Sequence, residues 1–104
     1  MKNKLPSVVV VTSAGEEVSS PDVQNDSRHF LSADVNVENR DIQLTFSTRQ
    51  AMYDFAKSLL QEAVFGKGGQ KEFYPLATNG KNLVVDGVRM SDKSSRIFVF
   101  YEDA

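Results

Sequence analysis

The 104-residue sequence contains no cysteine and no tryptophan, and its only histidine is His29. Without cysteine the chain cannot form disulfide bonds, zinc ribbons or thiol nucleophiles. A metal site around one histidine would need several carboxylates, and those near His29 are scattered along the chain. The Gly-x-Ser-x-Gly turn that presents a serine nucleophile is also absent. We therefore expect a protein that is not an enzyme and that uses no cofactor or metal.

Long apolar segments are missing as well. The valine run at 8–11 is too short for a secretory signal, and no segment approaches the ~20 apolar residues that span a bilayer. These absences predict a cytoplasmic protein without a membrane partner. The length fits a single domain, residues 1–104, whose core needs no disulfide or metal.

The net charge of −2 hides an uneven distribution along the chain. Residues 16–41 contain seven acids and two bases, whereas residues 49–96 contain eight bases and five acids. This asymmetry favours association with a basic partner, although such charges also occur on ordinary solvated surfaces. The candidate partner-binding residues are the seven acids Glu16, Glu17, Asp22, Asp26, Asp34, Glu38 and Asp41.

The first half of the chain predicts a strand, a long loop and a hairpin. Residues 8–12 are β-branched throughout, which favours a short buried strand. Residues 13–28 are rich in Ser, Gly, Pro, Asn and Asp, which indicates a long loop that is either functional or mobile. From Leu31 to Phe46, apolar and polar residues alternate on both sides of a polar turn at 39–41. This period of two predicts a hairpin with one face on the core.

An amphipathic helix follows the hairpin. Ser47-Thr48-Arg49-Gln50 has the form of a capping box with Ser47 as the N-cap, and the glycines at 66–69 predict a left-handed helix end. The apolar stripe of this helix comprises Met52, Phe55, Ala56, Leu59, Leu60, Ala63 and Val64. We expect all of these side chains to pack in the core, so that little of the stripe is left for a partner. The other side of the helix carries Asp54, Lys57, Ser58, Gln61 and Glu62.

Further strands are predicted after the helix. Pro75 indicates an edge strand at 72–77, and Asn79-Gly80 and Asp86-Gly87 are signals for tight turns. Residues 96–101 are apolar on both faces, which is typical of a central strand. The fold class that follows is α+β, with an antiparallel β-sheet of five to six strands and one amphipathic helix packed on one face.

The aromatic residues at 96–101 also raise the question of RNA binding, because RNA-binding sheets stack bases on such strands. The strand lacks the glycine that those strands carry, a second aromatic strand is not obvious, and the chain is not basic overall. Core packing is the simpler interpretation of Phe98 and Phe100. We therefore expect no direct binding of nucleic acid.

The C-terminal two-thirds of the chain resembles a family of inhibitors. The similar segments are Phe46-Ser47-Thr48, the Met52–Val64 helix, Leu83–Val88 and Ser95–Phe98. They resemble bacterial immunity proteins of contact-dependent growth inhibition systems. The resemblance implies a protein that binds and neutralises a cognate toxin domain, often a nuclease. Because a nuclease has a basic substrate channel, the acidic stretch could occupy that channel in place of phosphates.

Two other functions remain open. A structural or adaptor subunit, borne by a phage or plasmid, would oligomerise through the edge of the strand at 97–101. A small enzyme would need His29 in a pocket with a carboxylate or tyrosine partner. The oligomeric state and the surroundings of His29 therefore distinguish these functions from an immunity protein.

Overall fold

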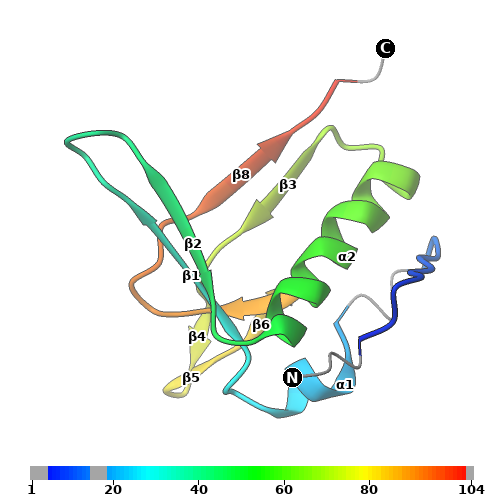
Figure 1. Cartoon of the computed structure of the whole chain (residues 1–104), viewed down its shortest axis with the longest axis horizontal. Helices are drawn as coiled ribbons and strands as arrows, with labels where there is room; N and C mark the ends of the chain where they lie inside the picture. Colours follow the sequence, from blue (N-terminus) through cyan, green and yellow to red (C-terminus); the bar gives the residue numbers. More distant parts are fainter. Residues whose placement is uncertain (1–4, 15–18, 103–104) are drawn as a thin grey trace.

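The computed structural model describes residues 5–14 and 19–102 and confirms the α+β class, with α2 as its one long helix (Figure 1). Helix α1 spans Pro21–Asn25 and helix α2 spans Arg49–Phe65. The strands are β1 Phe30–Val35, β2 Ile42–Phe46, β3 Gln70–Phe73, β4 Ala77–Thr78, β5 Lys81–Asn82, β6 Val84–Asp86, β7 Val88–Met90 and β8 Ile97–Phe100.

These strands form three sheets rather than the single sheet predicted. β2, β1, β7 and β6 form a four-stranded sheet in that order, while β3 pairs with β8 and β4 pairs with β5. β1 runs antiparallel to β2 but parallel to β7. An antiparallel sheet of five to six strands is therefore not confirmed.

The loop between β7 and β8 explains why the sheets separate. The amides of Ser91 and Ser95 donate to the carbonyls of Leu31 and Ala33, at 2.9 and 2.7 Å. The loop thus occupies the edge of β1 beyond β7, and the chain turns away to pair with β3. β8 is consequently not the central strand predicted at 96–101, because it belongs to a two-stranded ladder.

The core lies between α2 and the strands around it. The rings of Phe46, Phe55 and Phe73 form a row, with centroid separations of 5.4 and 4.6 Å. This row joins β2 to α2 and α2 to β3. The buried apolar residues are Val23, Leu31, Ala33, Ala51, Phe55, Phe73, Val88 and Met90.

The face that α2 turns to the core overlaps the predicted apolar stripe only in part, at Phe55 and Leu59. Its buried residues are Ala51, Asp54, Phe55 and Ser58. The exposed members of the predicted apolar stripe are Met52, Ala56, Leu60, Ala63 and Val64. Core packing therefore does not account for the whole stripe, and Met52 alone is 52% exposed. An apolar ridge with four-residue spacing remains on the surface of the helix.

The tight turn between β6 and β7 sets this orientation of α2. Gly87 has a φ of 69°, and a Cβ on it would lie 2.8 Å from the Asp54 carbonyl oxygen and 2.9 Å from Ser58 Cβ. Only a glycine opposite a small helix residue allows so close an approach. The turn predicted at Asp86-Gly87 is confirmed, and its packing explains why Ser58 is buried.

Both ends of α2 differ from the prediction. Thr48, not Ser47, is the N-cap, because Thr48 Oγ1 accepts from the Ala51 amide at 3.1 Å. The Ser47 hydroxyl instead accepts from the amide of Phe30 at 2.7 Å and so ties the helix start to β1. At the other end, Gly66 is the C-cap with an extended backbone, at φ −69°, rather than the left-handed one predicted.

The prediction for the segment before β1 was also wrong. Residues 8–12 form no strand, and two of their valines are exposed. The segment just before these residues contacts α2 instead, because the Tyr53 hydroxyl donates to the Pro6 carbonyl at 2.8 Å. Within the loop predicted at 13–28, a short helix is present, and the Ser20 side chain caps it.

The two hairpins predicted from turn chemistry are confirmed. β1 and β2 pair from Leu31–Phe46 to Val35–Ile42, and Asn79-Gly80 joins β4 to β5 with positive φ at both residues. The β1–β2 hairpin extends beyond the core, with its turn at the upper left of Figure 1. As a result, its apolar face is buried near the base but exposed toward the turn.

Candidate functional site

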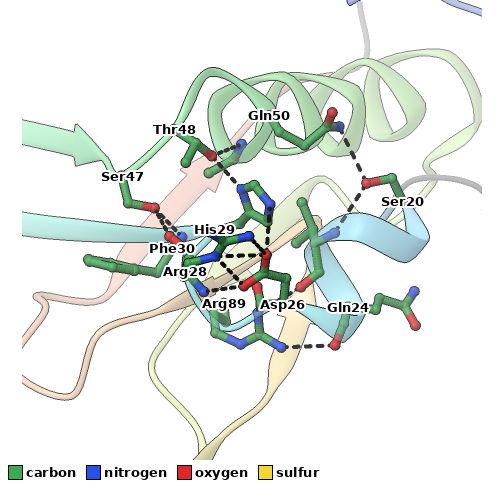
Figure 2. Close-up of polar contacts among 12 residues, drawn as sticks. Ser20, Gln24, Asp26, Arg28, His29, Phe30, Ser47, Thr48, Gln50 and Arg89 are labelled. Atoms are coloured by element: carbon green, nitrogen blue, oxygen red, sulfur yellow. Dashed lines mark hydrogen bonds and ion pairs between the residues drawn. The ribbon is translucent and has the colours of Figure 1, made fainter.

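His29 lies in a polar network between α1, β1 and α2 (Figure 2). Its Nδ1 is 2.6 Å from Thr48 Oγ1, and its Nε2 is 3.7 Å from Asp26 Oδ2. The Asp26 carboxylate also accepts from Nη2 and Nε of Arg28, at 2.6 and 3.0 Å. The hydrogen bonds from Arg28 hold the pKa of the Asp26 carboxyl well below its ordinary value.

This network meets the geometric condition for a small enzyme only in part. The His29 side chain is 17% exposed, has a carboxylate neighbour and borders a pocket of about 360 Å³. The hydroxyl beside the imidazole belongs to Thr48, which already caps α2 and does not line that pocket. The contacts of His29 join the α1–β1 connection to the start of α2.

Arg89, on β7, anchors α1 to the sheet. Its Nη1 donates to the carbonyls of Val23 and Asp26 at 2.6 and 2.9 Å, and its Nη2 donates to Gln24 at 3.1 Å. These carbonyls end α1 and carry partial negative charge, so the buried guanidinium caps the helix. Arg89 borders a pocket of about 710 Å³, but these donors point at the backbone.

A buried carboxylate joins α1 to α2. Asp54 is fully buried, and it accepts from the Ser20 amide at 2.6 Å and from the Gln50 side chain at 2.8 Å. Lys57 Nζ lies 3.6 Å from the same carboxylate. These groups replace water around the charge, which explains how α2 tolerates an acid on its core side.

A second polar cluster lies between α2 and strands β3 and β6. Lys71 Nζ is 2.6 Å from Asp86 Oδ2, and the Ser58 hydroxyl donates to Asp86 Oδ1 at 2.6 Å. Glu62 accepts from the Tyr101 hydroxyl at 2.6 Å. Across residues 5–14 and 19–102, every buried side-chain nitrogen or oxygen has a hydrogen-bond partner. No buried polar side-chain atom in these residues is therefore left unsatisfied.

The structure separates the predicted acidic residues into two groups. Asp22 and Asp26 lie on α1 or at its end, whereas Asp34, Glu38 and Asp41 lie on the β1–β2 hairpin. We call the second group the hairpin acids. In Figure 1, α1 is at the bottom and the hairpin turn is at the upper left, so the two groups do not form one surface. The predicted residues Glu16 and Glu17 lie outside the described residues.

The turn that carries the hairpin acids is ordered by its own hydrogen bonds. Asn36 Oδ1 accepts from the amide of Glu38 at 2.9 Å, and the Asn36 amide donates to the Asp41 carbonyl at 2.9 Å. Arg40 has a left-handed backbone, with φ 68°. All three hairpin acids are exposed, and no cation in the described part of the chain lies within 4.0 Å of their carboxylates.

Apolar side chains are exposed on the same hairpin and on β8. Phe98 and Phe100 are 48% and 70% exposed, and their rings stack at 6.5 Å. Core packing therefore does not explain these phenylalanines, contrary to the prediction. The exposed apolar residues of the hairpin are Val35, Val37, Ile42 and Leu44. Apolar patches of this kind are typical of interaction surfaces.

Sequence reasoning missed the residues that hold α1 in place. Asp54 was predicted on the side of α2 away from the apolar stripe, and Arg89 was counted only among the eight bases of residues 49–96. Arg89 did have a signal, since it stands between Val88 and Met90 in a short apolar segment, where a charge needs partners. Asp54 had none, because its partner Ser20 is 34 residues away.

Comparison with family models found no match, and comparisons with curated proteins and with solved structures found no similar protein. Neither helix in the described part of the chain is long and apolar enough to cross a membrane. Within those same residues, no group of three or more acidic or histidine side chains is arranged to hold a metal ion.

Proposed function

We propose that the chain is a non-catalytic immunity protein that binds a cognate toxin domain through the hairpin acids and neutralises it. The observation that carries this proposal is the exposure of three carboxylates, without a described cation partner, on an ordered and projecting hairpin. The partner that such a surface fits is a basic one, such as the substrate channel of a nuclease toxin.

The contrast with α1 supports the choice of these three residues. The Asp26 carboxylate is bound by Arg28, so part of its charge is already neutralised. The carboxylates of Asp34, Glu38 and Asp41 have only Arg40 as a nearby basic residue in the sequence. The hairpin therefore presents a net negative surface at a position that a concave partner can enclose.

The mechanism we propose is occupation of the toxin's phosphate-binding groups by carboxylates. Asp34 lies on the face of β1 opposite Leu31 and Ala33, and Glu38 lies in the turn. Because hydrogen bonds within the turn already order it, little conformational entropy is lost on binding. The exposed Val37 adds apolar contact beside the charges. Attraction between opposite charges would also speed association at low salt.

The test measures association between the full chain and the toxin domain encoded by the adjacent upstream gene. We expect the double variant Asp34→Lys/Glu38→Lys to associate about tenfold or more slowly than the wild type at low salt. The difference should shrink as added salt screens the charges. Association rates from stopped-flow or surface-binding measurements at two salt concentrations supply the comparison.

The single variant Glu38→Lys has a matched control in Asp22→Lys, which makes the same charge change on exposed α1. We expect the association rate of Asp22→Lys to stay close to that of the wild type. Equal slowing by Asp22→Lys and Glu38→Lys would reduce the effect to net charge. An adjacent gene that encodes no toxin, or unchanged binding by the double variant, would contradict the proposed function.

A second candidate function is a structural or adaptor subunit, and the exposure of β8 favours it. Phe98 and Phe100 stack on the surface, and Arg96 lies 5.4 Å from the ring centroid of Phe98. A partner that covers this strand would bury two aromatic rings, which are frequent binding anchors. Phe100→Ser should abolish such an assembly while leaving toxin binding unchanged.

A further inference from the structure

Among the described residues, no strand pairs with the outer edge of β2. β2 stands at the end of the four-stranded sheet, and its residues from Ile42 to Thr45 are exposed. Its sequence, Ile-Gln-Leu-Thr-Phe, contains no charge, proline or glycine. Charges and prolines are the usual protection of a free edge against pairing, so β2 is an unprotected template for another strand.

The register of the hairpin determines which backbone groups face this edge. The Asn36 amide donates to the Asp41 carbonyl, and the Ser47 amide donates to the Phe30 carbonyl. Both pairs continue the β1–β2 register, in which hydrogen-bonded pairs alternate with non-bonded ones. The odd-numbered residues of β2 therefore bond to β1. The N–H and C=O groups that point to the open edge are those of Ile42, Leu44 and Phe46.

We propose that this edge binds the same edge of a second copy of the chain, antiparallel and with the twofold axis at Leu44. About this axis, Leu44 pairs with its own symmetry mate, and Ile42 pairs with Phe46 of the second copy. Each pair exchanges two backbone hydrogen bonds, so about six bonds form. The interface closes on itself, because both copies use the same strand. The two four-stranded sheets become one continuous sheet.

The side chains fit this pairing. Ile42, Leu44 and Phe46 lie on one face of β2, the face that packs on Phe55 at its inner end. Pairing about Leu44 places the exposed Ile42 beside Phe46 of the second copy, and it places the two Leu44 side chains together. Aliphatic and aromatic neighbours across a strand pair stabilise a sheet. The dimer therefore covers apolar side chains that a single chain leaves in water.

The charges at the two ends of β2 are complementary in this arrangement. Asp41 precedes β2, and Arg49 begins α2 directly after its far end. Antiparallel pairing brings Asp41 of each copy toward the end where α2 of the other copy starts. Arg49 and the positive end of the helix dipole both attract a carboxylate there. The symmetry of the pair makes this contact twice, and the strands themselves bring no like charges together.

Mass in solution is the first test. Size-exclusion chromatography with light scattering, over a range of concentrations, should show the full chain approaching twice its mass of 11.6 kDa. Leu44→Lys places two like charges at the axis and should return the mass to that of one chain. Urea unfolding of Leu44→Lys at low concentration would confirm that the variant folds. A wild type that stays monomeric at every concentration would overturn the proposal.

Phe98→Lys is the matched control, because it puts the same charge on another exposed apolar strand. We expect Phe98→Lys to dimerise as the wild type does. Loss of the dimer in this control, with Leu44→Lys still dimeric, would assign self-association to β8 and overturn the role of β2.

Disulfide trapping tests the register, and the chain has no cysteine of its own to interfere. With the axis at Leu44, Gln43 faces Thr45 of the second copy in a non-hydrogen-bonded pair, where Cα atoms are about 4.5 Å apart. This separation suits a disulfide. The double variant Gln43→Cys/Thr45→Cys should therefore form a covalent dimer under mild oxidation, and neither single variant should do so. Rapid cross-linking of Gln43→Cys alone would move the axis by one residue and overturn the register.

This pairing goes beyond the proposed immunity function and does not depend on it. Of the hairpin acids only Asp41 lies beside the paired edge, while Asp34 and Glu38 lie off it, so Asp34→Lys/Glu38→Lys should still dimerise. Leu44→Lys should still bind the toxin domain. A failure of one proposal is thus measured separately from a failure of the other.

Discussion

Where α1 packs on α2, polar groups are buried with partners and apolar side chains are covered, whereas toward the tip of the β1–β2 hairpin both kinds are exposed. At the α1 end, Asp54 and Arg89 are buried and bind the backbone of α1 or of the residue before it. At the hairpin tip, Glu38 and Ile42 are exposed although their strands are well paired. The same kinds of residue thus stabilise the fold at one end and remain available for binding at the other.

The difference between these ends comes from what lies against each of them. Helix α2 packs on the base of the hairpin and β7 pairs with β1 there, whereas the described elements leave the outer part of the hairpin uncovered. Because backbone hydrogen bonds order the turn, its exposure does not depend on loss of structure. An ordered surface with uncovered apolar and acidic groups is typical of a binding site.

The largest expected effect is a difference in the free energy of unfolding between a buried and an exposed position of the hairpin. Leu31→Ala, at a fully buried residue, should cost about 3 kcal/mol of the free energy of unfolding, because it leaves a cavity. Ile42→Ala removes a side chain that is 72% exposed on the same face of the hairpin, and it should cost less than about 0.5 kcal/mol in dilute solution. Urea unfolding curves of both variants provide the measurement. Similar losses at the two positions would contradict the comparison.

A smaller effect should come from the turn that packs on α2. Gly87→Ala combines a left-handed backbone with a clash against the helix, and should cost about 2 kcal/mol or more. Gly80→Ala has a similar φ of 74° but nothing within 4 Å of the added Cβ, so it should cost about 1 kcal/mol. Thermal or urea unfolding can resolve the two. Equal costs would show that close packing on α2 is unimportant.

The smallest effect concerns Asp26 and its dependence on pH. Because Arg28 lowers the pKa of Asp26 in the folded state, the folded chain binds this proton less readily than the unfolded chain. The stability from Asp26 is therefore fully present above the ordinary aspartate pKa of about 4 and is lost as the pH falls below it. The urea midpoint of Asp26→Asn should lie slightly below that of the wild type at neutral pH, and the gap should close in acid. For comparison, Asp22→Asn removes the same charge from α1 without breaking the Arg28 contact.

Several local features of this fold could be predicted from neighbouring residues. The β1–β2 hairpin follows from its alternating pattern, and the turns at Asn79-Gly80 and Asp86-Gly87 follow from residues that adopt positive φ. The α2 helix was also correct in type and approximate extent, although both of its caps differ from the prediction. By contrast, the buried face of α2 was predicted only in part, because hydrophobicity alone cannot foresee that Ser58 must face Gly87.

The candidate site was predictable only in its composition. The acidic character of residues 16–41 is plain in the sequence, but their division into α1 and hairpin groups depends on where distant elements pack. The cysteine-free α+β character, with one long amphipathic helix, was set by the sequence itself, since absent residue types and local periodicity act without tertiary contacts. Which apolar side chains stayed exposed, and which acids acquired partners, was decided by the tertiary structure, because burial and pairing are relations between segments far apart in the chain.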